Sequence, residues 1–251
     1  MNIIEAYIKF KKQLIILVSG LPTSGRSSLV KTIGIDFKLN TLNLYDFYNL
    51  KYKEQIKLAN GIIKNNWYTH EAFDWDKFNM RVNELKGKGV VISGFCFPPD
   101  VLKFESDFHI HTAISKQVCL KRQNKFITRN KSKYPNEYNE LNTPTESMKM
   151  NKILYPAYLK YNKSMVINKY MNVNDLDQNQ IYDSSFNYLI QEIEKFLYRK
   201  QSQSNKKPYK PKKKGQGEYD IVVKPMQLQT GESIYHPPAM MSVNTQKYGF
   251  D

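Results

Sequence analysis

The sequence lacks several features that would assign it to other classes of protein. No stretch of its 251 residues approaches the roughly 18 consecutive apolar residues of a membrane span. The apolar block from Leu14 to Val18 is too short for the core of a secretory signal. Only two cysteines, Cys96 and Cys119, are present, too few for a disulfide framework or a four-cysteine zinc site. We therefore expect an intracellular, cytoplasmic protein that makes no contact with a membrane.

Acidic residues are missing from the segment that runs from Arg199 to Lys214, which holds eight basic residues. The rest of the chain has 30 basic and 23 acidic residues, so this segment carries more than half of the net charge of +15. Prolines interrupt it, and few apolar residues surround it. We predict a mostly disordered basic tail over residues 201–251, with one candidate strand at 221–223. From Arg199 to Lys214 it would make a weak, salt-sensitive contact with polyanions such as nucleic acid.

Residues 1–200 alternate between short apolar runs and amphipathic stretches, which is typical of one α/β domain. The continuous apolar runs indicate buried parallel strands. The predicted strands cover residues 14–19, 41–44, 90–92 and 107–112, and the predicted helices cover residues 27–33, 74–85, 115–126 and 184–198. Asp74 is expected to cap the second of these helices. The fold class is thus a mainly parallel sheet flanked by helices.

A glycine-rich segment lies between the first strand and the first helix. It reads Gly20-Leu-Pro-Thr-Ser-Gly25-Arg26-Ser27, which has the spacing of a phosphate-binding loop except that arginine replaces lysine. Such loops turn backbone N–H groups and a helix N-terminus toward an anion. We expect ATP and Mg²⁺ to bind here, with the Ser27 hydroxyl on Mg²⁺ and the nucleotide held by Gly20, Ser24, Gly25, Arg26, Ser27 and Ser28. The alternative is an ordinary glycine turn.

Three further segments follow the loop in a recognisable order. They read Asp46-Phe47-Tyr48, Asn66-Trp67-Tyr68 and Leu154-Tyr-Pro-Ala-Tyr158. With the loop they resemble the P-loop nucleoside kinases of the nicotinamide riboside kinase and uridine kinase group, over roughly residues 13–165 of this chain. The resemblance implies a P-loop kinase-type sheet with a mobile lid. It also implies ATP-dependent transfer of a γ-phosphoryl group to the 5′-hydroxyl of a nucleoside or riboside.

The resemblance also implies roles for individual residues. Asp46 matches the carboxylate beside the acceptor hydroxyl, where it would accept the hydroxyl proton, and it is assigned to catalysis together with Arg26. Tyr48, Trp67 and Tyr68 would bind the acceptor. For Asp46 the alternative is a cap at the end of a strand, and for Tyr48 it is a place in the core.

A basic helical stretch resembles the lid of these kinases. Arg122 and Arg129 would close over ATP and stabilise charge on the transferred group, and residues 130–145 would form the mobile part. A solvated basic helix face is the alternative for either arginine.

Three positions depart from the family pattern. Arg26 replaces the loop lysine, Ser93 stands where a glutamate near Mg²⁺ is expected, and Tyr68 replaces an aspartate that would hold the ribose hydroxyls. Together they indicate altered chemistry, a different acceptor, or a nucleotide-binding relative that lost catalysis and acts as a binding module through its basic tail. A kinase acting on nucleic-acid ends is a third hypothesis, which rests on the tail alone.

His109 and His111 alternate along a predicted strand and so share one face. Such a pair can ligate a metal. No third ligand is evident nearby, so two ordinary strand histidines are favoured. Cys96 and Cys119 are expected to be inert core residues.

Overall fold

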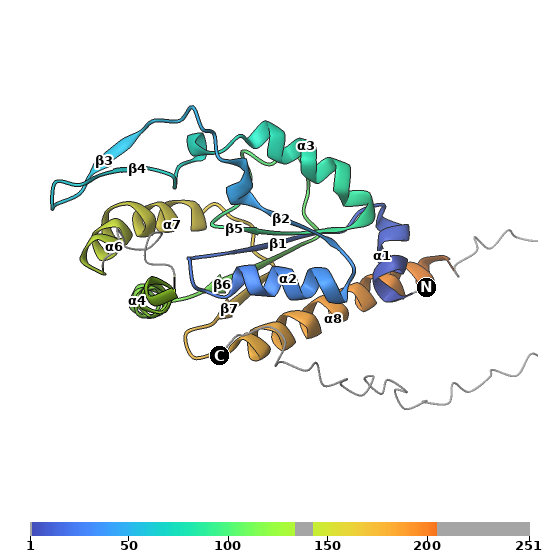
Figure 1. The fold of residues 1–251 in the computed structure, drawn as a ribbon. Coiled ribbons are helices and arrows are strands. Elements are labelled where there is room, and N and C mark those ends of the chain that lie inside the picture. The colour runs from blue at the N-terminus through green and yellow to red at the C-terminus, as the bar shows by residue number, and fades with distance from the viewer. Residues whose placement is uncertain (1, 134–142, 205–251) are drawn as a thin grey trace, which may run out of the picture. The chain divides into compact units, whose positions relative to one another are not determined.

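The computed structural model describes residues 2–133 and 143–204 (Figure 1). Its main sheet has five parallel strands in the order β2-β5-β1-β6-β7. Their bounds are β1 Ile15–Gly20, β2 Asn40–Asn43, β5 Val90–Gly94, β6 Phe108–Ala113 and β7 Lys169–Asn172. Because all run the same way, the segments that leave their carboxyl ends meet at one edge of the sheet.

Helices cover both faces of this sheet, so the predicted α/β fold is confirmed. In Figure 1, α3 (Trp75–Leu85) lies on one face, and α2 (Arg26–Asp36) with α8 (Gln178–Ser204) on the other. The remaining helices are α1 Ile3–Lys11, α4 Lys116–Lys133, α6 Thr143–Lys149 and α7 Tyr155–Asn162, and a π-helical turn Met150–Leu154 joins the last two. A small hairpin pairs β3 (Gln55–Lys57) with β4 (Ile63–Asn65).

Strand β1 shows why the sequence adopts this layered arrangement. Ile15 and Leu17 are buried with the α3 side of the core, whereas Ile16 and Val18 are buried with the α2 and α8 side. Alternate residues of a strand face opposite sides of its sheet, so a continuous apolar run fits a strand covered on both faces. Polar loops therefore remain at the strand ends.

Two of the predicted helices are shorter than the helices in the structure. The helix predicted at 115–126 continues to Lys133. The predicted mobile segment 130–145 is therefore helical at its start, and it is helical again from Thr143 on. Residues 134–142 lie outside the described part of the chain. The helix predicted at 184–198 spans Gln178–Ser204 and passes the predicted domain boundary at 200. The extensions are mostly polar, with residues such as Gln, Lys and Arg that favour helix, and their isolated buried residues Ile127 and Ile181 form no apolar period by themselves.

The predicted helix cap is confirmed, whereas the predicted tail lies outside the described residues. Asp74 caps α3 as predicted, because its carboxylate accepts a hydrogen bond from the Lys77 N–H at 3.1 Å. The predicted tail from residue 205 on, including the candidate strand at 221–223, lies outside the described residues. Within the described ranges, no helix combines the length and apolarity needed to cross a membrane.

Candidate active site

The loop between β1 and α2 has the geometry of an anion-binding turn. Gly20 has φ 153° and Gly25 has φ 87°, conformations that strain any L side chain. A Cβ on Gly20 would lie 2.5 Å from the Thr112 carbonyl oxygen, and one on Gly25 would lie 2.5 Å from Nε2 of Gln178. Among the described residues no side chain caps α2. Its first backbone N–H groups are therefore available to phosphate oxygens.

The three serines predicted to bind nucleotide point in different directions. Ser24 is buried, and its hydroxyl donates to Thr112 Oγ1 at 2.7 Å, while Thr112 donates to the Ser19 carbonyl. Only the backbone of Ser24 is thus left for an anion. Ser27 and Ser28 are exposed and line two different cavities, on either side of the start of α2.

Arg26 is buried, with 5% of its surface exposed. One end of its guanidinium donates to the Gly20 carbonyl, and the other donates to the Tyr45 hydroxyl at 2.7 Å. None of the ion pairs among the described residues includes Arg26. A buried cation without a carboxylate is costly, so this position favours an incoming anion. Burial raises the pKa of Tyr45, and the positive charge of Arg26 opposes that rise.

A cavity of about 250 Å³ at the strand ends brings predicted residues together. Its polar lining comes from Ser27, Lys31, Thr41, Asn43, Asp46 and Ser93. Ser93, at the end of β5, donates to Asn43 Oδ1 at 3.3 Å, and the same amide oxygen accepts from the Tyr45 N–H at 3.3 Å. The residue that departs from the expected glutamate therefore anchors the 3-10 turn Leu44–Phe47, which carries Asp46.

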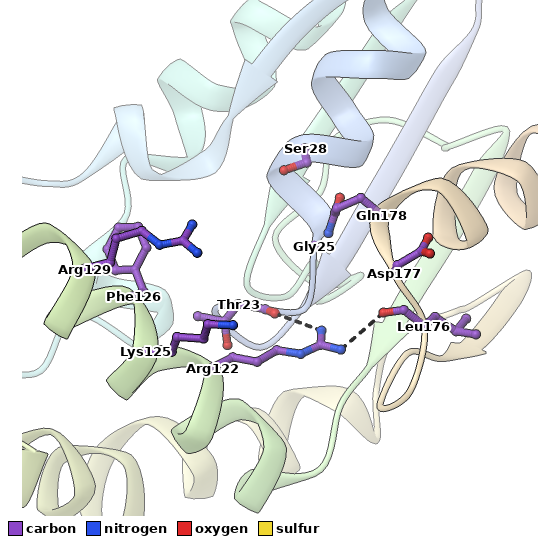
Figure 2. Close-up of a pocket in the computed structure, with 10 residues that line it drawn as sticks. All are labelled: Thr23, Gly25, Ser28, Arg122, Lys125, Phe126, Arg129, Leu176, Asp177 and Gln178. Atoms are coloured by element: carbon purple, nitrogen blue, oxygen red, sulfur yellow. Dashed lines mark hydrogen bonds between the residues drawn. The ribbon is translucent and has the colours of Figure 1, made fainter. Parts of the chain in front are cut away.

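A larger cavity, of about 600 Å³, lies on the other side of the loop (Figure 2). Figure 2 shows Lys125, Phe126 and Arg129 of α4 across from Gly25 and Ser28. Arg122 lines it too, but its guanidinium donates to four backbone carbonyls, those of Thr23, Val173, Asn174 and Leu176. In this structure Arg122 therefore ties α4 to the phosphate loop and to the segment that follows β7.

Aromatic side chains pack behind Asp46. Tyr48 stacks on Phe73 with centroids 4.8 Å apart, and Trp67 packs against Tyr48 at 5.0 Å. Tyr48 and Asp46 line one open cavity of about 770 Å³. The structure thus brings Asp46 and Tyr48 together, with Trp67 in support.

Tyr68 lies close enough to Arg26, Tyr45 and Tyr48 for their charges to affect its pKa. It packs edge-on against Phe95 at 5.1 Å, and it does not line the Asp46 cavities. Burial raises its pKa well above the usual range for tyrosine. A neutral, half-buried tyrosine therefore stands where a ribose-binding carboxylate was expected.

A chain of buried hydrogen bonds lies beneath the phosphate loop. His109 Nδ1 is 2.7 Å from the Val166 carbonyl, and a carbonyl can only accept, so that nitrogen carries the proton. The remaining directions follow. Tyr158 donates to His111 Nε2 at 2.7 Å, His111 Nδ1 donates to Ser19 Oγ at 2.8 Å, and Ser19 donates to His109 Nε2 at 2.7 Å.

This chain gives both histidines a structural explanation. Each ring nitrogen has a partner, and no group of three potential metal ligands exists among the described residues. Burial lowers the pKa of both His109 and His111 to about 4, so both are neutral at pH 7. Cys96 and Cys119 are buried and free, and burial raises the pKa of each thiol, which keeps both protonated.

Sequence reasoning missed Tyr45, Asn43 and Lys125. Tyr45 lies inside the segment that was singled out, yet its contact with Arg26 joins two elements and leaves no local pattern. Asn43 did offer a signal, since asparagine before a turn commonly caps it. Lys125 is one of several cations on α4, and only the fold tells which of them line the cavity.

Comparison with known proteins gives a fold likeness and no family. No protein-family model matches the chain, and no curated protein matches it. An unliganded sugar kinase from Janibacter sp. HTCC2649 is 13% identical, with a TM-score of 0.46 over 70% of this chain and 94% of that one. Thymidylate kinase from Candida albicans is 11% identical, with a TM-score of 0.46 over 72% and 92%. Identities this low assign neither a substrate nor a family to this chain.

Proposed function

We propose that the protein is an ATP-dependent phosphotransferase that moves the γ-phosphoryl group of ATP to the 5′-hydroxyl of a riboside. The observation that carries this proposal is the uncapped start of α2 between two cavities. The lining of one cavity includes Arg122, Lys125 and Arg129, and the lining of the other includes Ser27 and Asp46. A phosphate bound at the helix N-terminus would lie between a donor nucleotide and an acceptor hydroxyl.

The donor side comprises the loop and the cavity of Figure 2. Backbone N–H groups of Gly25 to Ser28 would hold the phosphates, and about 600 Å³ beside them accommodates the rest of a nucleotide. Lys125 and Arg129 add positive charge there, and Arg122 links α4 to the segment after β7 through its hydrogen bond to the Val173 carbonyl. Phosphoryl transfer depends mainly on such positioning and electrostatic stabilisation.

Mg²⁺ fits the donor set of the small cavity. Hydroxyl, amide and carboxylate oxygens from Ser27, Asn43 and Asp46 line it, and Mg²⁺ prefers oxygen ligands, commonly one or two carboxylates together with substrate phosphates. Ser27 and Asp46 are the residues that would hold the ion, directly or through water. When bound, Mg²⁺ neutralises charge on the phosphate oxygens.

The acceptor side comprises Asp46, Tyr48 and the aromatic residues behind them. Asp46 is exposed and lines both the small cavity with Ser27 and the larger one with Tyr48. Its carboxylate would orient the 5′-hydroxyl and accept its proton as the hydroxyl oxygen bonds to the γ-phosphorus. The bond between the γ-phosphorus and the bridging oxygen breaks, which leaves ADP and a phosphorylated riboside. Tyr48, backed by Trp67, would stack on the acceptor.

Transfer of label from [γ-³²P]ATP to a panel of ribosides tests the proposal. We expect Mg²⁺-dependent labelling of at least one riboside by the wild-type protein. ATP hydrolysis without any labelled riboside would contradict the acceptor assignment, and failure to bind ATP at millimolar concentration would contradict the donor assignment.

A second candidate is a nucleotide-binding protein without transferase activity. The observation that favours it is Ser93, which gives the end of β5 a hydroxyl bonded to Asn43 in place of a carboxylate. Such a protein would bind ATP and label no acceptor. In either case we propose that the basic tail contacts polyanions. Removal of residues 205–251 should weaken binding to single-stranded DNA and flatten its dependence on salt.

A further inference from the structure

Arg26 connects two elements that belong to opposite sides of the proposed site. Gly20 ends β1 and opens the phosphate loop, whereas Tyr45 lies in the 3-10 turn immediately before Asp46. The guanidinium donates to the carbonyl of the first and to the hydroxyl of the second, at 2.7 Å for Tyr45. Its Cζ lies 5.2 Å from the Tyr45 ring centroid. One buried side chain therefore joins the loop to the turn that carries Asp46.

The geometry of this bridge requires arginine. A guanidinium is a planar fork whose two ends donate in different directions, so it can hold acceptors on two elements at once. A lysine ammonium is a single point of charge on a flexible stem, and it would have to choose between Gly20 and Tyr45. Arginine at the usual lysine position and tyrosine before Asp46 therefore depend on each other.

The bridge also leaves binding capacity for an anion. Two of the five guanidinium N–H groups are used by Gly20 and Tyr45, and no carboxylate of the described residues pairs with the charge. The uncapped start of α2 lies in the same loop. Together they suit an oxyanion such as the terminal phosphate of a nucleoside triphosphate.

We propose that Arg26 and Tyr45 form one positioning unit, in which Tyr45 holds the Arg26 guanidinium where it contacts the terminal phosphate of a nucleoside triphosphate in line with Asp46. This inference rests on the proposed function for the identity of the ligand. Tyr45 is a positioning residue, because it acts through Arg26 and through the placement of the neighbouring Asp46.

A double-mutant cycle tests the unit with Tyr45→Phe, Arg26→Lys and the double variant in the full-length chain. The readout is the ratio of the dissociation constants of ADP and ATP, measured by calorimetry. ADP lacks the terminal phosphate, so a loss confined to that phosphate changes the ratio, whereas a general loss of structure weakens both nucleotides alike. Tyr45→Phe keeps the ring and its packing on Tyr48, so the variant should fold.

Tyr7→Phe is the matched control. Tyr7 is buried, whereas Tyr45 is half-buried, and the Tyr7 hydroxyl likewise bonds a charged partner: it donates to Asp107 at 3.1 Å, next to the amino end of β6. We expect this change to lower the melting temperature and to leave the ADP-to-ATP ratio unchanged.

We expect Tyr45→Phe to weaken ATP binding by about tenfold, the scale of one hydrogen bond to a charged group, and ADP binding by less than about twofold. Arg26→Lys should do the same, and the double variant should be no weaker than Arg26→Lys alone. Effects that multiply, or a ratio that Tyr45→Phe leaves unchanged, would overturn the unit. Because the cycle is read from binding, the absence of phosphoryl transfer would contradict the proposed function without deciding this inference.

Discussion

The proposed donor and acceptor sides of the site differ in what holds them in place. On the donor side the essential groups are backbone: two glycines, an uncapped helix and a loop supported by the buried hydrogen bonds of Ser19, His109 and His111. On the acceptor side the essential groups are side chains, and two expected carboxylates are replaced by Ser93 and Tyr68. Backbone geometry tolerates sequence change more readily than charge placement does, so chemistry can change here while the fold stays the same.

The replacements on the acceptor side are integrated into the structure. Ser93 supports the cap of the turn that presents Asp46, and Tyr68 fills space against Phe95. Asp46 is the carboxylate that remains in the small cavity with Ser27. If the site is catalytic as proposed, the demand for a carboxylate in the small cavity falls on Asp46 alone among its lining residues.

Asp46→Asn tests that demand most directly. The amide keeps the shape of the side chain but cannot accept a proton, so phosphoryl transfer should fall by about 10²–10⁴-fold, the scale of a positioned acid or base. ATP binding, measured by calorimetry without Mg²⁺, should stay within about twofold, because the backbone of the phosphate loop supplies its own contacts. Asp76→Asn is the control: Asp76 is exposed, lines the same large cavity and pairs with Lys103, so its change should leave both values unchanged. Equal losses in the two variants would contradict the assignment of Asp46.

The free energy of unfolding should depend on pH because of the two buried histidines beneath the phosphate loop, His109 and His111. The unfolded chain takes up protons near the ordinary histidine pKa of about 6.5, but folded His109 and His111 take them up only near pH 4. Between these values the unfolded state binds more protons, so the free energy of unfolding should fall on acidification by up to about 1.4 kcal/mol per pH unit for each histidine. Above about pH 7 their contribution should be constant.

Urea unfolding from pH 7.5 to 4.5 measures this slope. The His109→Gln, His111→Gln double variant should show a shallower slope, although it is less stable at pH 7.5. His70→Gln is the control: burial lowers the pKa of His70 too, but its side chain is 25% exposed, so its removal should change the slope less. An unchanged slope in the double variant would show that other groups control acid unfolding.

Much of the donor side could be predicted from the sequence. An apolar run, two glycines at fixed spacing and a following helix are local patterns, and local patterns determine the backbone of such a loop. The strands at 14–19, 90–92 and 107–112 were located within two residues of their bounds for the same reason. The hairpin Gln55–Asn65 and strand β7 escaped because they are short and polar, and tertiary contacts decide their conformation.

The acceptor side was less accessible to sequence reasoning. Asp46 and Tyr48 were singled out. The bond from Arg26 to Tyr45, however, joins α2 to the 3-10 turn, and the bond from Ser93 to Asn43 joins β5 to β2, so both connect separate elements of the chain. The direction of Tyr68 was equally hidden, because a polar-to-aromatic replacement gives no information about where the new ring packs. Contacts of this kind follow from strand order, which the local patterns do not contain.

Gly25→Ala tests whether the donor loop depends on its backbone. Alanine is strained at φ 87°, and its Cβ would meet Gln178 at 2.5 Å, so ATP binding should weaken by about tenfold or more. Gly61→Ala is a close match, because Gly61 has φ 83° but nothing within 4 Å of the added Cβ. It should lower stability by about 1 kcal/mol and leave ATP binding unchanged. Similar binding losses in both variants would point to general strain and away from the loop.

Ser93→Glu should produce the smallest effect, and it addresses the acceptor side. Ser93 is 4% exposed and lines the small cavity with Ser27 and Asp46. A carboxylate there would add one negative charge among the oxygen ligands proposed for Mg²⁺. We expect the Mg²⁺ concentration for half-maximal transfer to fall several-fold. Ser93→Gln is the control, because it has nearly the same size without the charge and loses the same bond to Asn43.

The two Ser93 variants separate the effect of the added negative charge from the effect of losing the hydrogen bond to Asn43. Both remove the hydroxyl that helps to hold the turn carrying Asp46, so both should lower kcat by a similar factor. The added charge should then shift the Mg²⁺ dependence of the glutamate variant alone. If both variants shift that dependence equally, the small cavity binds no Mg²⁺, and the role of Ser93 is to hold the turn that carries Asp46. If only the glutamate variant shifts, the acceptor side has exchanged a metal ligand for a turn anchor, and the exchange can be reversed by one residue.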